Sequence, residues 1–114
     1  MKFRIQDGEL MEIYNPEKIF LQPVIKKVWM SPEEYITRCA DILQTTPKAL
    51  IAERIDDRLT GILKAFNEGK TFCMPSLNYI DKTQDGLHRA MAANTLGIEK
   101  IPVIIVDKNT NEVI

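Results

Sequence analysis

Two stretches near the start of the chain have patterns that predict strands. Residues 2–14 alternate around an Asp-Gly pair at positions 7–8, a turn signal typical of a β-hairpin. The Asn-Pro pair at positions 15–16 ends this pairing. Residues 24–29 are rich in β-branched and aromatic side chains, so we expect another strand.

The first predicted helix has a complete start signal. Ser31 is a good N-cap, Pro32 suits the first helical position, and Glu34 completes a capping box. The helix is predicted to run to about Gln44. Its apolar face consists of Tyr35, Ile36, Cys39, Ile42 and Leu43.

A second helix start, Thr46 before Pro47, is followed by apolar residues at helical spacing. They are Ile51, Ile55, Leu59, Ile62, Leu63 and Phe66. One amphipathic helix ending at Gly69 is therefore predicted. Because Gly61 is unfavourable inside a helix, we expect close packing or a kink there.

Three carboxylates lie on the polar face of this second helix. Glu53, Asp56 and Asp57 have the spacing to share a magnesium ion. Arg54 and Arg58 interleave with them, which is typical of a solvated face. The solvated face is the favoured interpretation, and no metal site is assigned.

The last third of the chain predicts a strand, a helix and a second strand. Residues 72–80 read as a strand that includes a Met-Pro pair, and an alanine-rich helix is predicted from Asp85 to Gly97. Pro102 then opens a continuously apolar strand at residues 103–106, typical of a central strand covered on both faces. Together these elements predict one α+β domain over residues 1–114, with a small mixed sheet and about three helices.

Composition is that of an ordinary globular chain. The 114 residues are 45% hydrophobic and 27% charged, so one core can form without a disulfide or metal. A net charge of −1 does not support binding to duplex DNA. Two isolated cysteines and a single histidine do not support a zinc site. Without a signal-peptide pattern or a membrane-length apolar run, a cytoplasmic location with reduced thiols is expected.

The sequence Asp-Gly-Leu-His-Arg at residues 85–89, here the 85–89 motif, carries the candidate chemistry. Asp85 is expected as the N-cap, and Gly86 would let the backbone approach a ligand. His88, Arg89 and the first-turn amides then favour an anion at one point. These four residues are the predicted phosphate site. The Asp85 carboxylate would make binding depend on a cation such as Mg²⁺.

The motif, followed by Ala-rich turns, Leu-Gly-Ile and Ile-Pro-Val-Ile, resembles the ParB/sulfiredoxin superfamily, often labelled ParB-like nuclease domains. The likeness covers about residues 62–106 and includes the Gly-Lys turn and Met-Pro pair before the motif. It implies a small α+β fold in which Gly86, His88 and Arg89 bind nucleotide phosphates.

Leu87 departs from two branches of that superfamily. Sulfiredoxins carry a cysteine nucleophile between the glycine and the histidine, and Leu87 has no thiolate to offer. Partition ParB proteins tend to have glutamate and arginine where this chain has Leu87 and His88. The departure therefore speaks against sulfiredoxin activity and against partition-type nucleotide hydrolysis.

The leading functional prediction is binding of a nucleotide or phosphate ester, with a nucleoside triphosphate and Mg²⁺ as the expected ligands. Phosphotransfer or hydrolysis is left open, because spacing alone assigns no general base. The alternative is a non-catalytic DNA- or protein-interaction module of phage or mobile-element type. A nuclease is the third interpretation, and it lacks a metal-binding carboxylate cluster other than the one at residues 53–57.

Overall fold

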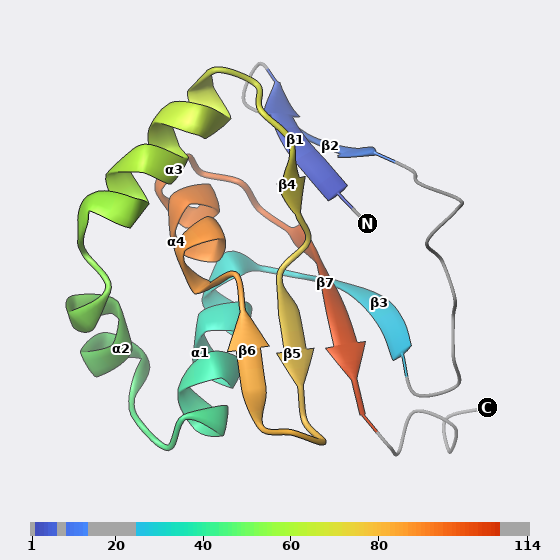
Figure 1. Ribbon diagram of the computed structural model, residues 1–114, viewed down its shortest axis with the longest axis vertical. Helices are drawn as coiled ribbons and strands as arrows, with labels where there is room; N and C mark the ends of the chain where they lie inside the picture. Colours follow the sequence, from blue (N-terminus) through green and yellow to red (C-terminus); the bar gives the residue numbers. More distant parts are fainter. Residues whose placement is uncertain (1, 7–8, 14–24, 108–114) are drawn as a thin grey trace.

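A computed structural model of the chain describes residues 2–6, 9–13 and 25–107 (Figure 1). The strands are β1 (Lys2–Gln6), β2 (Glu9–Ile13), β3 (Ile25–Met30), β4 (Phe72–Cys73), β5 (Ser76–Asn78), β6 (Thr83–Asp85) and β7 (Ile101–Val106). The helices are α1 (Pro32–Ile42), α2 (Pro47–Glu53), α3 (Asp57–Asn67) and α4 (Leu87–Thr95). The predicted α+β class is confirmed, with four helices in the described residues in place of about three.

The described strands form two sheets. One has the order β2-β1-β4 and is antiparallel, and the other has the order β3-β7-β5-β6. Only β5 and β7 pair in parallel, so the larger sheet is mixed, as predicted. Figure 1 shows β4 leading directly into β5, so one extended segment serves both sheets.

The predicted hairpin is confirmed in its strands, since β1 pairs with β2 in a register that places Gln6 opposite Glu9. Its turn at residues 7–8 and the break at residues 15–16 lie outside the described residues. The strand predicted at residues 24–29 is also confirmed, shifted by one residue as β3.

The central strand of the larger sheet is β7, as predicted from its apolar run. It pairs with β3 on one side and β5 on the other, and Ile101 and Val103 are fully buried. Pro102 is the second residue of β7 and not the first. It tolerates this position because β5 starts only opposite Ile104, so β5 has no residue opposite the proline.

The prediction of one strand over residues 72–80 is wrong. Met74 and Pro75 separate β4 from β5, and both residues are buried. Pro75 has no amide hydrogen for a sheet ladder, although its carbonyl accepts a bond from the Ile104 amide at 2.9 Å. The chain therefore changes from one sheet to the other at this proline.

The N-cap and the first residue of α1 are as predicted, whereas the Glu34 carboxylate, expected to complete a capping box, pairs with Arg38 at 3.3 Å. The Ser31 hydroxyl accepts a bond from the Glu34 amide at 3.1 Å, and Pro32 is the first helical residue. The helix ends at Ile42, slightly before the predicted end at Gln44. Gln44 has a left-handed φ of 57° and cannot continue the helix.

The prediction of one helix over residues 47–69 is wrong. The chain leaves the helix after α2, and extended Asp56 starts α3 by accepting bonds from the amides of Arg58 (3.0 Å) and Leu59 (3.3 Å). This carboxylate offers the backbone an alternative to continuing the helix. Ile55 consequently leaves the apolar stripe and is 69% exposed. α3 continues through Gly61, and the close packing expected there is wrong, since a Cβ at residue 61 would meet nothing within 4 Å.

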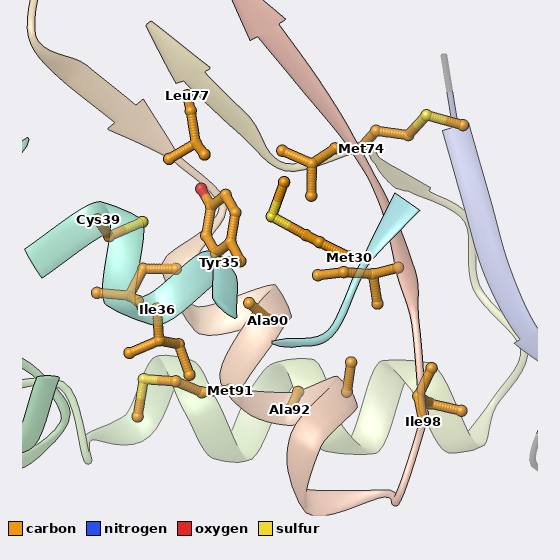
Figure 2. Close-up of a cluster of buried hydrophobic side chains, with 14 of the residues drawn as sticks. Met30, Tyr35, Ile36, Cys39, Met74, Leu77, Ala90, Met91, Ala92 and Ile98 are labelled. Atoms are coloured by element: carbon orange, nitrogen blue, oxygen red, sulfur yellow. The ribbon is translucent and has the colours of Figure 1, made fainter. Parts of the chain in front are cut away.

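The core lies between the larger sheet and the helices α1 and α4 (Figure 2). Figure 2 shows Tyr35 of α1 directed toward Leu77 of β5, with Ala90 of α4 below its ring. The Tyr35 hydroxyl donates to the carbonyls of Asp85 (2.8 Å) and Ser76 (3.0 Å). This hydroxyl ties α1 to the ends of β5 and β6.

The smaller sheet is covered by an aromatic cluster. Phe66 of α3 packs edge-on against Phe72 of β4, with ring centroids 4.4 Å apart, and Phe3 of β1 lies beside both. Edge-to-face aromatic pairs stabilise beyond their buried area. In the described residues, no helix combines the length and apolar character needed to cross a membrane.

Gly61 provides a test of the α3 assignment. A Cβ added at residue 61 would meet nothing within 4 Å, and the residue is exposed inside a helix. Because glycine loses more backbone entropy on folding than alanine, Gly61→Ala should raise the free energy of unfolding by about 0.5–1 kcal/mol. Urea unfolding followed by circular dichroism measures this change. A lower free energy of unfolding would mean that the backbone at residue 61 is not helical.

Candidate functional site

The predicted phosphate site lies at the start of α4, but its cap is not the predicted residue. Gly86, and not Asp85, occupies the N-cap position, with φ of 110° and no capping side chain. Asp85 is the last residue of β6, where it pairs with Ser76 and its carbonyl accepts from Tyr35. These contacts fix the Asp85 backbone as a strand end, so its carboxylate does not cap the helix.

Gly86 is required by the packing of the chain itself. A Cβ at residue 86 would lie 2.8 Å from the Cα of Pro75 and 3.3 Å from Cζ of Arg89. Its positive φ is also unfavourable for residues with a side chain. The predicted reason for this glycine, close approach of a ligand, is therefore not needed to explain it.

Arg89 is held at the start of α4 by two intramolecular contacts. Its Nη1 donates to the carbonyl of Cys73, and its Nη2 lies 3.1 Å from Oδ1 of Asp85. The Arg89 side chain is only 14% exposed, whereas that of Asp85 is 81% exposed. The guanidinium is thus fixed against β4, while its carboxylate partner is largely in solvent.

His88 is paired with a residue that the sequence did not assign to the site. Its Nε2 lies 3.1 Å from Oδ1 and 3.3 Å from Oδ2 of Asp56, the N-cap of α3. The structure therefore brings the starts of α3 and α4 together. The sequence did contain one signal for a helix start at this point, because aspartate, here Asp56, is favoured at N-caps. The spacing of Asp56 from Glu53 suggested instead that both residues lie on one continuous helix face.

The charges at these two helix starts are arranged in two pairs, Asp56 with His88 and Asp85 with Arg89. Partial desolvation raises the pKa of Asp56, but bonds from the amides of Leu59 and Arg58 and the charge of His88 outweigh it. The pKa of Asp56 consequently lies below its ordinary value of 3.8. Asp56 is therefore a carboxylate at neutral pH.

The two cysteines differ in their relation to the motif. Cys39 is buried in α1, and burial raises the pKa of its thiol to about 11, so it carries little thiolate at neutral pH. Cys73 is exposed and contacts the motif through its carbonyl, which binds Arg89. Leu87 is buried and belongs to the core, as its apolar character indicated.

The three carboxylates whose spacing suits a magnesium ion do not share a helix face. Glu53 ends α2, whereas Asp56 and Asp57 start α3. Within residues 2–6, 9–13 and 25–107, no three His, Cys, Asp or Glu side chains gather as metal ligands would. A hollow of about 230 Å³ lies elsewhere, at the end of α1, and none of the four predicted site residues lines it.

The conformation of Gly86 can be tested with two matched glycines. Gly86→Ala combines a positive φ with overlap on Pro75, so the free energy of unfolding should fall by roughly 2 kcal/mol or more. Gly97→Ala has a similar positive φ but no neighbour within 4 Å, so the loss should be only about 1 kcal/mol. Chemical unfolding of both variants measures the difference. Equal losses would contradict the contact with Pro75.

The lowered pKa of Asp56 predicts a pH-dependent contribution to stability. The folded state favours the ionised carboxylate, so this contribution is present above the ordinary value of 3.8 and is lost as pH falls through the lower folded value. Asparagine also caps helices but does not ionise. Between about pH 5 and pH 2, the wild type should therefore lose more stability than Asp56→Asn. Parallel losses in the two proteins would contradict the assignment.

Comparison with known proteins does not assign the chain to a family. No protein-family model matches the chain, and neither the curated proteins nor the solved structures contain a match. The likeness of the 85–89 motif to the ParB/sulfiredoxin superfamily rests on the residues alone and stays a prediction.

Proposed function

We propose that the start of α4 binds the phosphate of a nucleotide or phosphate ester. The observation that carries this proposal is a helix start without a capping side chain, beside a guanidinium whose carboxylate partner is mostly exposed. Unsatisfied first-turn amides and the helix dipole favour an anion there. Arg89 adds donors that can bind a phosphate in a bidentate manner.

A phosphate at this site would compete with Asp85 for Arg89. Because the Asp85 side chain is 81% exposed, breaking this ion pair costs only about 0–1 kcal/mol. Asp85 is therefore a weak competitor for a phosphate at Arg89. The released carboxylate can share a Mg²⁺ ion with the phosphate, which gives the expected dependence on a cation.

The ParB/sulfiredoxin resemblance supports the same proposal, because it assigns nucleotide phosphates to Gly86, His88 and Arg89. The alternative is a non-catalytic DNA- or protein-interaction module, in which both ion pairs at the 85–89 motif are purely structural. A thermal-shift screen with ATP, CTP, GTP and ADP, with and without Mg²⁺, separates these functions. A higher melting temperature with any nucleotide supports binding. If no nucleotide raises the melting temperature, the interaction module is the favoured function.

Replacement of Arg89 should weaken nucleotide binding. Arg89→Gln removes the positive charge, so affinity for the best nucleotide should fall about ten- to more than hundredfold in calorimetric titration. Arg89→Lys should recover part of it, since an ammonium keeps the charge but not the planar fork. Arg38→Gln is a matched control, because Arg38 forms the same kind of ion pair with Glu34 on α1. Unchanged affinity in a folded Arg89→Gln variant would refute the site.

Asp85→Asn should strengthen nucleotide binding when Mg²⁺ is absent. Removing the negative charge leaves Arg89 without a competing carboxylate, so Mg²⁺-free affinity should rise severalfold. The gain in affinity on adding Mg²⁺ should become smaller, because a carboxylate ligand is lost. Calorimetric titrations with and without Mg²⁺ measure both effects. If neither affinity changes, Asp85 does not face the bound phosphate.

A further inference from the structure

The contact between Asp56 and His88 orients the histidine ring. Both carboxylate oxygens lie within hydrogen-bonding distance of Nε2. In a neutral imidazole, the nitrogen that faces a carboxylate carries the hydrogen, and the other nitrogen keeps its lone pair. Pairing with Asp56 therefore assigns the lone pair to Nδ1.

The His88 side chain is 11% exposed. Within the described part of the chain its Nδ1 has no hydrogen-bond partner, and the one fully buried, unpaired side-chain nitrogen or oxygen is Nε of Arg4. Nδ1 is therefore not fully buried. His88 is the second residue of α4, next to Arg89 and to the uncapped amides. An open imidazole nitrogen thus lies beside the proposed phosphate position.

The charges around His88 come from three sides. Asp56, the N-cap of α3, lies behind Nε2, and Asp85 pairs with the neighbouring Arg89. The next two residues of α3, Asp57 and Arg58, are exposed. A carboxylate behind one ring nitrogen and an open second nitrogen is the arrangement of a general base oriented by its partner.

We infer that His88 is a general base for nucleoside triphosphate hydrolysis, with Asp56 as the residue that positions it. This inference rests on the proposed function. A water molecule gives a proton to Nδ1 as its oxygen bonds to the terminal phosphorus, and the bond from that phosphorus to the bridging oxygen breaks. The products are a nucleoside diphosphate and inorganic phosphate, and the imidazolium then releases its proton to solvent.

The test measures phosphate release from the best-binding triphosphate with Mg²⁺, across pH, alongside binding of its non-hydrolysable analogue. A positioned general base contributes about 10²- to 10⁴-fold, so His88→Gln should lose at least about a hundredfold in turnover. Binding of the analogue should change only a few-fold, since the lone pair on Nδ1 donates no hydrogen bond to the phosphate and its loss removes none. The wild-type rate should rise with pH, because a general base acts only in its unprotonated form, and this rise should be absent from His88→Gln.

Asp56→Asn and Asp56→Ser keep a capping side chain on α3 but remove the charge behind His88. Both should lower turnover about tenfold or more and alter the pH profile, while the analogue still binds. Asp57→Asn, one residue further along α3, is the matched control and should behave as the wild type. Thermal unfolding of each variant shows that it is folded before turnover is compared.

Two failures are distinguishable. If the nucleotide binds in an Arg89-dependent manner but is not hydrolysed, or if His88→Gln hydrolyses it as fast as the wild type, the general base is refuted and the binding site stands. If no nucleotide binds to the wild type, the proposed function fails first, and this inference fails with it.

Discussion

The close approach of Gly86 to Pro75 is the constraint on which the rest of the site depends. With no Cβ at residue 86, the start of α4 lies directly against the segment between β4 and β5. At this distance Arg89 reaches the carbonyl of Cys73, and β6 can end opposite Ser76. One glycine thus allows a helix, the switch between two sheets and an edge strand to meet at one place.

Polar groups around this contact divide into two kinds. Burial raises the pKa of Tyr35 far above its ordinary range, so its hydroxyl stays a donor to the Asp85 and Ser76 carbonyls. The Cys39 thiol is likewise protonated at neutral pH. These groups hold the backbone, whereas the carboxylates of Asp56 and Asp85 are exposed. The chemistry proposed above therefore rests on the residues that pair with these two carboxylates.

Elements with strong local signals were predicted correctly. The Ser31 cap and the apolar run of β7 are encoded in consecutive residues, and so is the helix end at Gly97, whose φ is 75°. The predictions that were wrong concern features that depend on distant parts of the chain. Nothing next to Asp85 indicates that Tyr35 binds its carbonyl, and the apolar spacing is the same on both sides of the break at Asp56. His88 and Arg89 lie in the first turn of α4, as the predicted helix start implies, but their contacts with Asp56 and Cys73 required the fold.

The bonds from the Tyr35 hydroxyl join residues 41 and 50 positions apart in the sequence. Contacts of such high contact order are slow to form, because the entropy of closing the intervening loop opposes them. The start of α4 is therefore held through α1, because the residue that precedes Gly86 is bound by a side chain of that helix. A fragment lacking α1 would lack this support for the first turn of α4.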